Sequence, residues 1–505
     1  MKRGERQSPA RTRAGWLSEA GGLICRMGGA GFARGLAVIA WLAFFSALAA
    51  AQGGGATPPA PRPPVTMLRH EEDWSSLREP ARRTEYLDAL KYIPLGREGW
   101  YVTLGGEARP YYEWFRNEEW GAATQERDGW LLQRYMLHAD MHMGPQVRFF
   151  AQLRSGIEIG RAGGPRPPDE DRLGVHQAFL ELRHALSERR TLSLRVGRQE
   201  LNFGSARLVT MREGPNVRLS FDGALVTLRE GAWRLDGYAV KPVATNPGVF
   251  DDGAITSQSL WGLYAVRPMP QAPRKGNLDL YYFGLDRKRA RFNQGIGREQ
   301  RQTVGARLWN RRGGFDYNYE MIAQFGRFTA LNGARGRIRA WTTASETGYS
   351  FHRAAFQPRI TLKANVTSGD RDPNDPDLGT FNPLFPRGAY FGQLSPVGPL
   401  NHRDLHPGIE LAFPRRVSVT ADWVFYWRQS LRDGVYGVPG NLERSGNRSR
   451  ERFIGHQPGV EAVWRLDAYT TITLNWAGFR AGRFLRETPP GRNMRYFALW
   501  MTYKF

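Results

Sequence analysis

From residue 101 onward, the dominant period of apolar and polar side chains along this chain is two. The stretch WLLQRYMLHADMHM (130–143) is the clearest case: Tyr135, Leu137 and Met141 share one face, and Arg134 and His138 share the other. A period of two is that of a β-strand, whose successive side chains point to opposite faces. Segments of about 11–14 residues are long for a soluble sheet, where about 5–6 is usual, and they suit strands that cross a bilayer at a tilt.

The alternation predicts 18 strands and the connections between them. Connections after even-numbered strands are mostly short, such as Gly144-Pro145, whereas those after odd-numbered strands are long, such as 161–174 and 369–404. This asymmetry is typical of outer-membrane barrels, which have short periplasmic turns and long extracellular loops. The expected fold is all-β, an 18-stranded antiparallel transmembrane β-barrel over 101–505. Its strands are expected at 101–115, 130–143, 146–160, 175–186, 191–203, 216–229, 232–242, 257–267, 277–287, 300–311, 315–328, 338–351, 358–368, 405–413, 417–430, 456–466, 470–481 and 494–505.

The final stretch, RYFALWMTYKF, places an apolar residue at every second position: Phe497, Leu499, Met501, Tyr503 and Phe505. In lipid every backbone N–H and C=O must be paired within the protein, so the sheet must have no free edge. The last strand is therefore expected to pair with the first. The aromatic pair Tyr503 and Phe505 also resembles the signal that the barrel-assembly machinery of the outer membrane reads.

The N-terminal region predicts export across an inner membrane. An apolar run, GLAVIAWLAFFSAL (35–48), follows Arg26 and Arg34 and precedes Ala49-Ala50-Ala51, which is the order of a secretory signal peptide. Residues 1–51 are expected to be removed. Met27 is an alternative initiator, because the stretch before the apolar run is long. Residues 52–100 are expected to form a Gly/Pro-rich tether and a short periplasmic segment.

Charge and cysteine usage narrow the function classes. The chain has 71 Lys and Arg residues against 48 Asp and Glu residues, and its single cysteine, Cys25, lies in the segment expected to be removed. Disulfides and Cys-ligated metals are therefore not expected in the exported chain. A basic cytosolic chain would suggest nucleic acid. For an exported chain, lipopolysaccharide, an anionic polymer or an acidic sugar is the more plausible partner, and general solubility is the simpler alternative.

If the apolar stripe faces lipid, the polar stripe lines a lumen wide enough for an aqueous channel. An arginine fork can bind both oxygens of a carboxylate, so a surplus of arginine favours anions. The alternative is that these residues only fill a closed or non-selective lumen. The expected pore-lining residues are Arg109, Arg134, Arg148, Arg154, Arg183, Arg195, Arg234, Arg307, Arg359, Lys363, Arg428 and Arg465, with Glu107, Asp140, Glu158 and Glu181 as acidic partners.

Several stretches, taken together, resemble the alginate export (alginate porin-like) family of outer-membrane barrels. They are LRVGRQELNFGSARLV (194–209), NVRLSFDGALV (216–226), NLDLYYFGLDRK (277–288), ASETGYSF (344–351) and SGDRDPNDPDLGTFNPLFPRGAYFG (368–392), with EEDWSSLREPARRTEYLDALKYIPL (71–95) before the barrel. The resemblance implies a monomeric 18-stranded barrel with an arginine-rich channel. The founding members of the family carry a polyuronate, and for this chain the resemblance implies an anionic saccharide or a small organic anion. It also implies that Arg198, Gln199 and Glu200 form a pore or rim element, although Arg198 falls on the lipid-facing parity.

The segment 369–404 is long enough to fold inward as a lid. Its aspartates do not fit an EF-hand, since Asp375 stands where the loop glycine should be and Phe381 where the last glutamate should be. Pairing of these aspartates with loop arginines is preferred over metal binding. The trio His138, Asp140 and His142 shares a strand face, and lumen polarity explains it more simply than catalysis.

These observations predict an outer-membrane channel of a Gram-negative-type bacterium, not an enzyme, for passive, anion-favouring passage of an acidic polysaccharide or small anionic solutes. The alternatives are a general or solute-uptake porin and, more remotely, an outer-membrane hydrolase. No cofactor, no metal and no nucleic acid are expected. The expected partners are outer-membrane lipids and lipopolysaccharide, the barrel-assembly machinery and periplasmic polysaccharide-secretion proteins.

Overall fold

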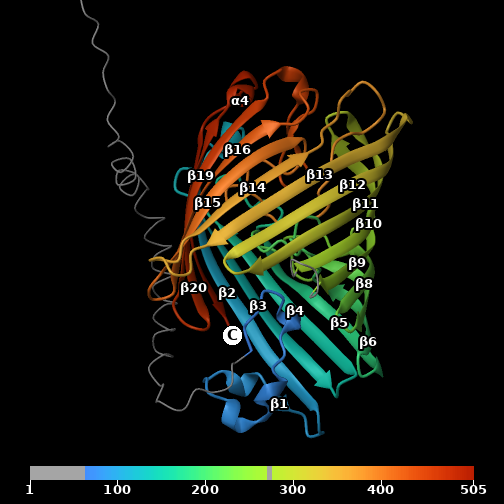
Figure 1. The fold of residues 1–505 in the computed structure, drawn as a ribbon, viewed down its shortest axis with the longest axis vertical. Coiled ribbons are helices and arrows are strands. Elements are labelled where there is room, and N and C mark those ends of the chain that lie inside the picture. Colours follow the sequence, from blue (N-terminus) through green and yellow to red (C-terminus); the bar gives the residue numbers. More distant parts are fainter. Residues whose placement is uncertain (1–62, 270–275) are drawn as a thin grey trace, which may run out of the picture.

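The computed structural model describes residues 63–269 and 276–505, and the described chain forms one closed antiparallel β-barrel (Figure 1). The expected signal peptide and most of the expected tether lie outside these ranges. Eighteen strands form the wall, and the two-residue strand β1 (Ile93–Pro94) adds to it at β2. The expected all-β, 18-stranded architecture is confirmed. Within 63–269 and 276–505, no helix is long and apolar enough to span a bilayer.

The wall strands run in chain order and each pairs with its neighbours in sequence. They are β2 (Trp100–Arg116), β3 (Trp130–Met143), β4 (Val147–Ile159), β5 (Asp171–Ser187), β6 (Arg190–Gln199), β7 (Phe221–Glu230), β8 (Trp233–Pro242), β9 (Gln258–Met269), β10 (Gly276–Phe292), β11 (Gly295–Arg312), β12 (Phe315–Ala330), β13 (Arg335–Ser350), β14 (Arg359–Thr367), β15 (His402–Phe413), β16 (Val417–Arg428), β19 (Phe453–Arg465), β20 (Thr470–Ala481) and β21 (Met494–Lys504).

Closure of the barrel joins β2 to β21, as the sequence predicts. Glu107 stands opposite Lys504 and Arg116 opposite Arg495, so no wall strand keeps a free edge. The ring of Phe505 lies against Gly106, where an added Cβ would come within 2.6 Å of that ring. Glycine at this position therefore makes room for the last aromatic side chain.

We name the two ends of the barrel by the chain. The proximal rim is where β2 begins, beside the segment 63–99, and the distal rim is opposite (Figure 1). The described turns at the proximal rim include 188–189, 231–232 and 313–314, and the longest connections, 200–220, 368–401 and 429–452, start from the distal ends of strands.

One expected long connection is wrong. The ninth strand is expected to end at residue 287 and the tenth to begin at 300, whereas β10 and β11 continue to a two-residue turn at 293–294. A register shift between Arg287 and Ala290 breaks the alternation, so the period of two is lost there although pairing continues. Beyond the shift, Ala290 and Phe292 are buried against Phe328.

The segment 63–99 packs across the proximal rim. It consists of four short 3-10 helices (Arg69–Glu71, Ser75–Arg78, Pro80–Arg82 and Asp88–Leu90) followed by β1. Arg69 donates to the carbonyls of Gly106 and Phe505, and Lys91 Nζ donates to the carbonyl of Leu104 at 2.9 Å. The segment thus holds the seam between β2 and β21 from inside the proximal mouth.

The core lies inside the barrel, where two distal connections fold inward. In the connection 200–220, Phe203 stacks on Tyr238 and Tyr264, whose side chains point into the lumen. In the connection 368–401, Phe385 is buried against Phe221. The two connections also touch, since Thr210 N donates to the carbonyl of Phe385 at 3.1 Å. The expected inward folding of the 369–404 segment is seen directly. The remaining short elements are α3 (Glu118–Gly121), β17 (Val435–Tyr436), β18 (Leu442–Arg444), a 3-10 turn (Gly446–Arg448) and α4 (Arg483–Glu487).

Candidate functional site: an arginine-rich lumen

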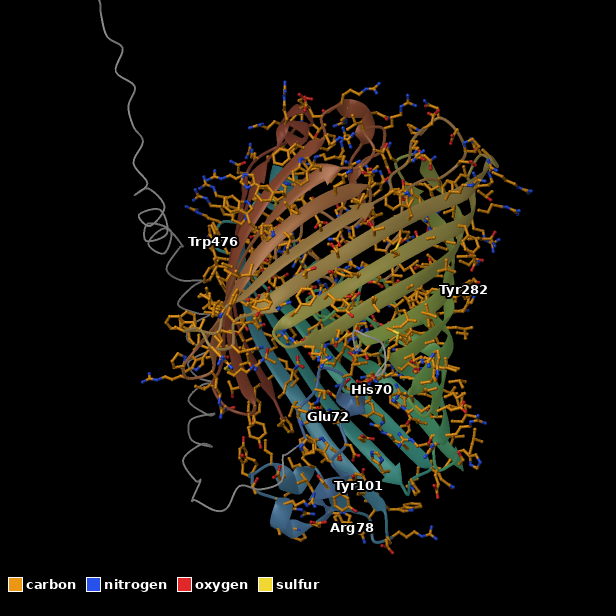
Figure 2. The ribbon with its side chains drawn as sticks, viewed as in Figure 1. His70, Glu72, Arg78, Tyr101, Tyr282 and Trp476 are labelled. Atoms are coloured by element: carbon orange, nitrogen blue, oxygen red, sulfur yellow. The ribbon has the colours of Figure 1, made fainter. Side chains whose placement is uncertain are left out.

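The alternation along each strand sorts side chains to the two faces of the wall. Outward residues such as Leu137, Leu263 and Met321 are 62%, 64% and 67% exposed, as lipid-facing side chains of an isolated barrel must be. Tyr282 and Trp476, labelled in Figure 2, lie on this outer surface. Polar and charged side chains of the opposite parity fill or line the interior. The candidate functional residues therefore lie in the lumen.

A buried ion network crosses the lumen between β2, β3 and the connection 200–220. Arg134 donates to Glu107 Oε1 at 2.7 Å and to Glu213 Oε1 at 2.6 Å. Arg218 pairs with Glu213 and lies 3.5 Å from Glu107. Burial alone raises the pKa of Glu213, but Arg134 and Arg218 outweigh burial and hold that pKa at about 2. Arg109 adds bonds to the carbonyls of Glu213, Gly214 and Pro215. These groups anchor the inward connection to the wall.

A second buried network lies beside it. Arg154 Nε donates to Asp171 Oδ2 at 2.6 Å, and its Nη2 donates to Asp252. His176 stands between Arg154 and Glu200, with Nε2 2.8 Å from Glu200 Oε1. Arg109, Arg134 and Arg154 are thus committed to carboxylates or carbonyls of the protein.

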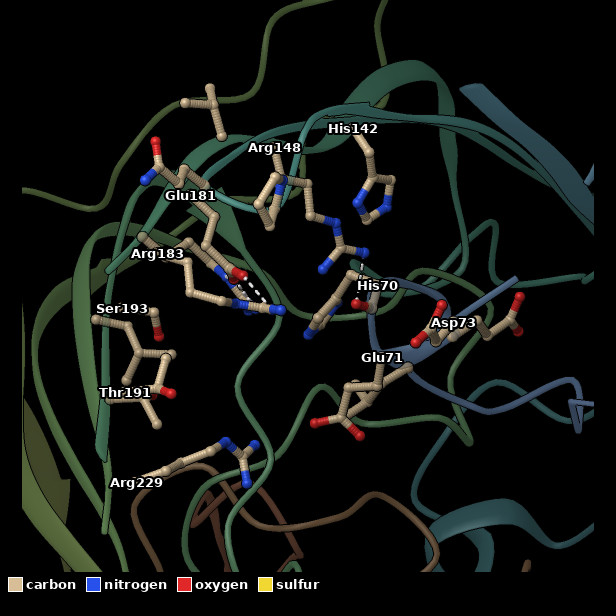
Figure 3. A pocket seen from close by; sticks show the side chains of 18 of the residues that line it. His70, Glu71, Asp73, His142, Arg148, Glu181, Arg183, Thr191, Ser193 and Arg229 are labelled. Carbon is tan, nitrogen blue, oxygen red and sulfur yellow. Dashed lines mark hydrogen bonds and ion pairs between the residues drawn. The ribbon is translucent and has the colours of Figure 1, made fainter. Parts of the chain in front are cut away.

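A cavity of about 870 Å³ opens at the proximal mouth, and it collects the arginines of β4 to β8 (Figure 3). Arg195 donates to Glu181 at 2.6 Å, Arg148 donates to Asp140 at 2.6 Å, and Glu181 also accepts from Arg183. The strands place five arginines in its lining against the single carboxylate of Glu181. These arginines are Arg148, Arg183, Arg195, Arg229 and Arg234. Asp140 and Asp236 of the wall pair with Arg148 and Arg234 at 2.6 and 2.9 Å, so the positive excess of the wall rests on Arg183, Arg195 and Arg229 against Glu181.

The segment 63–99 brings carboxylates to the same cavity. Glu71, Glu72 and Asp73 line it, and Figure 3 shows Glu71 and Asp73 beside His70. The carbonyl of His70 accepts from Arg148 at 2.6 Å. The imidazole ring of His70 packs edge-on against Phe150 and Phe179. Burial lowers the pKa of His70 well below its usual value, with Arg195 and Arg148 adding to the effect. Acidic residues of the chain thus stand where an anion would meet the arginines.

The other expected pore residues divide between the open wall and the loops. Arg359 donates to Asp316 at 2.6 Å and to Glu410 at 2.5 Å, and Lys363 lies 4.0 Å from Glu346. Between β11 and β10, Arg307 donates to Asp279 at 2.9 Å. Arg465 is exposed at the proximal end of β19, and Glu158 accepts from the backbone of Arg161 at the distal end of β4. Arg428 is fully buried and donates to the carbonyls of Leu431, Asp433, Ser449 and Glu451, so it organises the connection 429–452.

The expected family element around GRQE is split between the two faces. Arg198 keeps the outward parity and donates to Asp222 at 2.8 Å and to the carbonyl of Val175 at 3.1 Å. No bulge turns it inward, so it does not line the lumen. Gln199 and Glu200 are buried inside, where Glu200 belongs to the network of His176.

Sequence reasoning missed Glu213, Arg218, Arg229 and the seam residue Arg69. Glu213 and Arg218 lie in a connection without periodicity, so no strand pattern points to them. Arg229 was accessible to the parity argument, because it shares the inward face with Leu225 and Thr227. The contact between Arg69 and residue 505 depends on closure of the barrel, so no local sequence pattern indicates it. Among the described residues, no group of three His, Cys, Asp or Glu side chains is placed to hold a metal ion.

Comparison with solved structures identifies the architecture. The barrel is similar to OccD3 (OpdP) of Pseudomonas aeruginosa, with a TM-score of 0.52 at 13% identity over 82% of this chain and 92% of that one. OccK8 (OprE) of the same organism gives a TM-score of 0.53 at 12% identity, over 80% and 98%. OccK2 (OpdF), solved in complex with glucuronate, gives 0.51 at 12% identity, over 80% and 98%. Such low identities establish the fold alone.

The family follows from the sequence model rather than from these structures. No curated protein matches the chain. The model described as "Alginate export" matches residues 100–498, which span the barrel from β2 to β21. Membership together with the porin-like barrel places the protein in the outer membrane and among channel proteins. The chain belongs to the alginate export family.

Proposed function

We propose that the barrel passes anionic saccharides or small organic anions by diffusion, with the proximal cavity as the site that favours anions. The observation that carries this proposal is that the wall places five arginines in one cavity and that two of them, Arg183 and Arg229, stay exposed there. A guanidinium fork binds both oxygens of a carboxylate, and rings of positive charge lower the barrier for anions in a pore.

The pairing of the other arginines in the lumen also supports selectivity for anions at the proximal cavity. Arg134 and Arg154 are neutralised by carboxylates of the protein, as in the Arg134–Glu213 pair at 2.6 Å. Arg229 lines the cavity and is exposed there, and Arg183 pairs with Glu181 while its side chain stays 55% exposed. Both remain open to a passing solute. The cavity, rather than the buried network, therefore sets the charge that a solute first meets.

Two related findings bear on the substrate class. The family model is described as "Alginate export", and alginate is a polyuronate. The structural neighbour OccK2 was solved with glucuronate, and OpdK, with a TM-score of 0.52 at 12% identity, was solved with vanillate. Uronates and vanillate are carboxylates. Uptake of small carboxylates is accordingly the second candidate function, favoured by these two bound molecules.

Ion selectivity in planar bilayers tests the proposal. In a KCl gradient the wild-type channel is expected to show a reversal potential on the anion-selective side, and added polyuronate is expected to block the current. The variant Arg183→Gln/Arg229→Gln should shift the reversal potential toward zero. A matched control, Arg415→Gln/Arg416→Gln, removes the same charge from the exposed proximal turn 414–416 outside the cavity. Cation selectivity in the wild type, or equal shifts in both variants, would refute the proposal.

Block of the channel current by added solutes separates the two candidate functions, which are passage of a polymer and uptake of small carboxylates. Polyuronate block at concentrations where monomeric uronate has no effect favours the polymer, and the reverse favours small carboxylates. Hydrolysis of either solute in the same chamber would instead indicate an enzyme.

The orientation and partners are part of the proposal. The proximal rim, which carries the segment 63–99, is expected to face the periplasm, where secretion proteins would deliver a polymer to a monomeric barrel. Protease added to intact cells should spare this segment and cut the distal connections. Cleavage of 63–99 in intact cells would reverse the orientation.

A further inference from the structure

The distal rim carries a notch in its outer wall that the lumen does not use. Strand β14 ends at Thr367, while its neighbour β13 continues toward the rim. The chain 376–378 fills part of the gap, since Leu378 N donates to the carbonyl of Arg337 at 2.9 Å. This approach needs Gly336, where an added Cβ would lie 1.5 Å from the carbonyl oxygen of Pro376. A cavity of about 730 Å³ remains beside the edge of β13 to which 376–378 is bonded.

Side chains of the outward parity form one side of the notch. Arg337, Arg339 and Trp341 point away from the lumen, since the residues between them, Ile338 and Ala340, are buried inside. Arg371, Arg432, Arg450 and Arg452 complete the basic lining from the connections 368–401 and 429–452. The notch is therefore a feature of the membrane-facing surface at the rim.

The basic charge of the notch is only partly neutralised. Asp377 accepts from Arg337 at 3.3 Å, and Asp372 lies 3.9 Å from Arg432. Six arginines meet four aspartates in the lining, and the ion pairs of the described residues leave out Arg339, Arg371, Arg450 and Arg452. An excess of guanidinium on this surface is costly against hydrocarbon and favourable against anionic headgroups.

Aromatic side chains on the same face mark the level of the membrane interface. On β16, Trp423, Phe425 and Trp427 stack along the outer wall with centroids 5.7 and 6.2 Å apart. Trp427 stands opposite Arg403 on β15, whose guanidinium bonds the side chain of Gln429 at the edge of the notch. Aromatic rings sit at the headgroup level of a bilayer, so the arginines above them lie among the headgroups.

We propose that this notch binds the phosphate groups of lipopolysaccharide, the phosphorylated glycolipid of the outer leaflet. Arginine suits phosphate because its planar fork makes two parallel hydrogen bonds. Trp341 at the base of the notch offers an apolar face to the acyl chains of the same molecule, and it is 38% exposed. The site is independent of solute passage, because it lies on the other side of the barrel wall.

Native mass spectrometry of the full barrel in detergent with EDTA tests the site, using bisphosphorylated lipid A and its dephosphorylated form as probes. The wild type is expected to retain bisphosphorylated lipid A and to lose the dephosphorylated lipid. The variant Arg339→Gln/Arg450→Gln should weaken retention by roughly thirtyfold, since each arginine near an anionic headgroup contributes a factor of about five.

Two controls keep the result interpretable. Arg415→Gln/Arg416→Gln removes the same charge at the opposite rim and should leave retention unchanged. Arg339→Lys/Arg450→Lys keeps the charge and should retain the lipid, which excludes a folding defect as the cause of loss. Equal retention by the Gln variant and the wild type, or equal binding of both lipid forms, would overturn the proposal. A loss of retention in both Gln variants would show attraction by net charge alone and would overturn it as well.

Discussion

Replacing Arg69 by methionine should loosen the seam of the barrel. The Arg69 side chain is 1% exposed, and so is that of its partner Glu72, whose Oε1 accepts from Arg69 Nε at 2.7 Å. The substitution also removes the donors to the carbonyls of Gly106 and Phe505. Hydrogen bonds to charged groups contribute about 1.5–3 kcal/mol each, and breaking a buried pair costs about 3–5 kcal/mol. We therefore expect Arg69→Met to lower the free energy of unfolding by about 3–5 kcal/mol.

Guanidinium unfolding of the folded barrel in detergent, followed by loss of heat-modifiable migration, measures this effect. The matched control is Arg82→Met, since Arg82 makes an equivalent (i, i+3) pair with Glu79 but is 44% exposed. An exposed pair contributes at most about 1 kcal/mol. Hydrogen exchange should locate the loss in β2 and β21. If the two variants unfold at the same guanidinium concentration, the seam contacts of Arg69 do not stabilise the barrel and the reasoning fails.

Three further predictions concern assembly, the lumen and the distal connection. Deleting Phe505 should reduce the amount of heat-modifiable barrel in outer-membrane fractions, and normal levels would count against a role as assembly signal. Glu213→Gln should remove the negative charge that Arg134 contacts at 2.6 Å, so the connection 200–220 loosens and single-channel conductance becomes larger and noisier; Glu170→Gln, whose partner Arg172 is 72% exposed, is the control and should change neither. Burial and the nearby Asp433 raise the pKa of Asp370 to about 6, so its contribution to stability is full below about pH 4 and is lost as the pH rises through 6. The free energy of unfolding should therefore fall between pH 5 and 7 in the wild type and fall less in Asp370→Asn, which guanidinium unfolding at each pH measures.

Most of the fold was predictable from one periodicity. Lipid outside and polar groups inside impose opposite demands on alternate residues, so each strand carries its own evidence in the sequence. The prediction failed between β10 and β11, where the register shift after Arg287 exchanges the two faces and hides the continuing strand. The same limit applies to residues 200–203, which keep a strand-like composition but leave the wall after Gln199.

For the candidate site, the sequence predicted which side chains face the lumen but not how those side chains are paired. Parity placed Arg134, Arg148 and Arg195 on the inner face, but it did not indicate which arginines have partners. The partner of Arg134 is 79 residues away in an inward connection, and such a pairing depends on how the loop folds rather than on any local pattern. Separating structural arginines from those open to a solute therefore required the three-dimensional arrangement.

The contact between Arg69 and residue 505 also orders the events of assembly. The two residues are 436 positions apart, so the first described part of the chain to be synthesised can reach its final place only after the last strand has arrived. Loop closure over such a separation is slow compared with the pairing of neighbouring strands. The pairing of β1 with β2 can form earlier, but the contact between Arg69 and residue 505 must wait until the sheet closes. The time at which the seam between β2 and β21 becomes protected from exchange therefore reports when the barrel is complete.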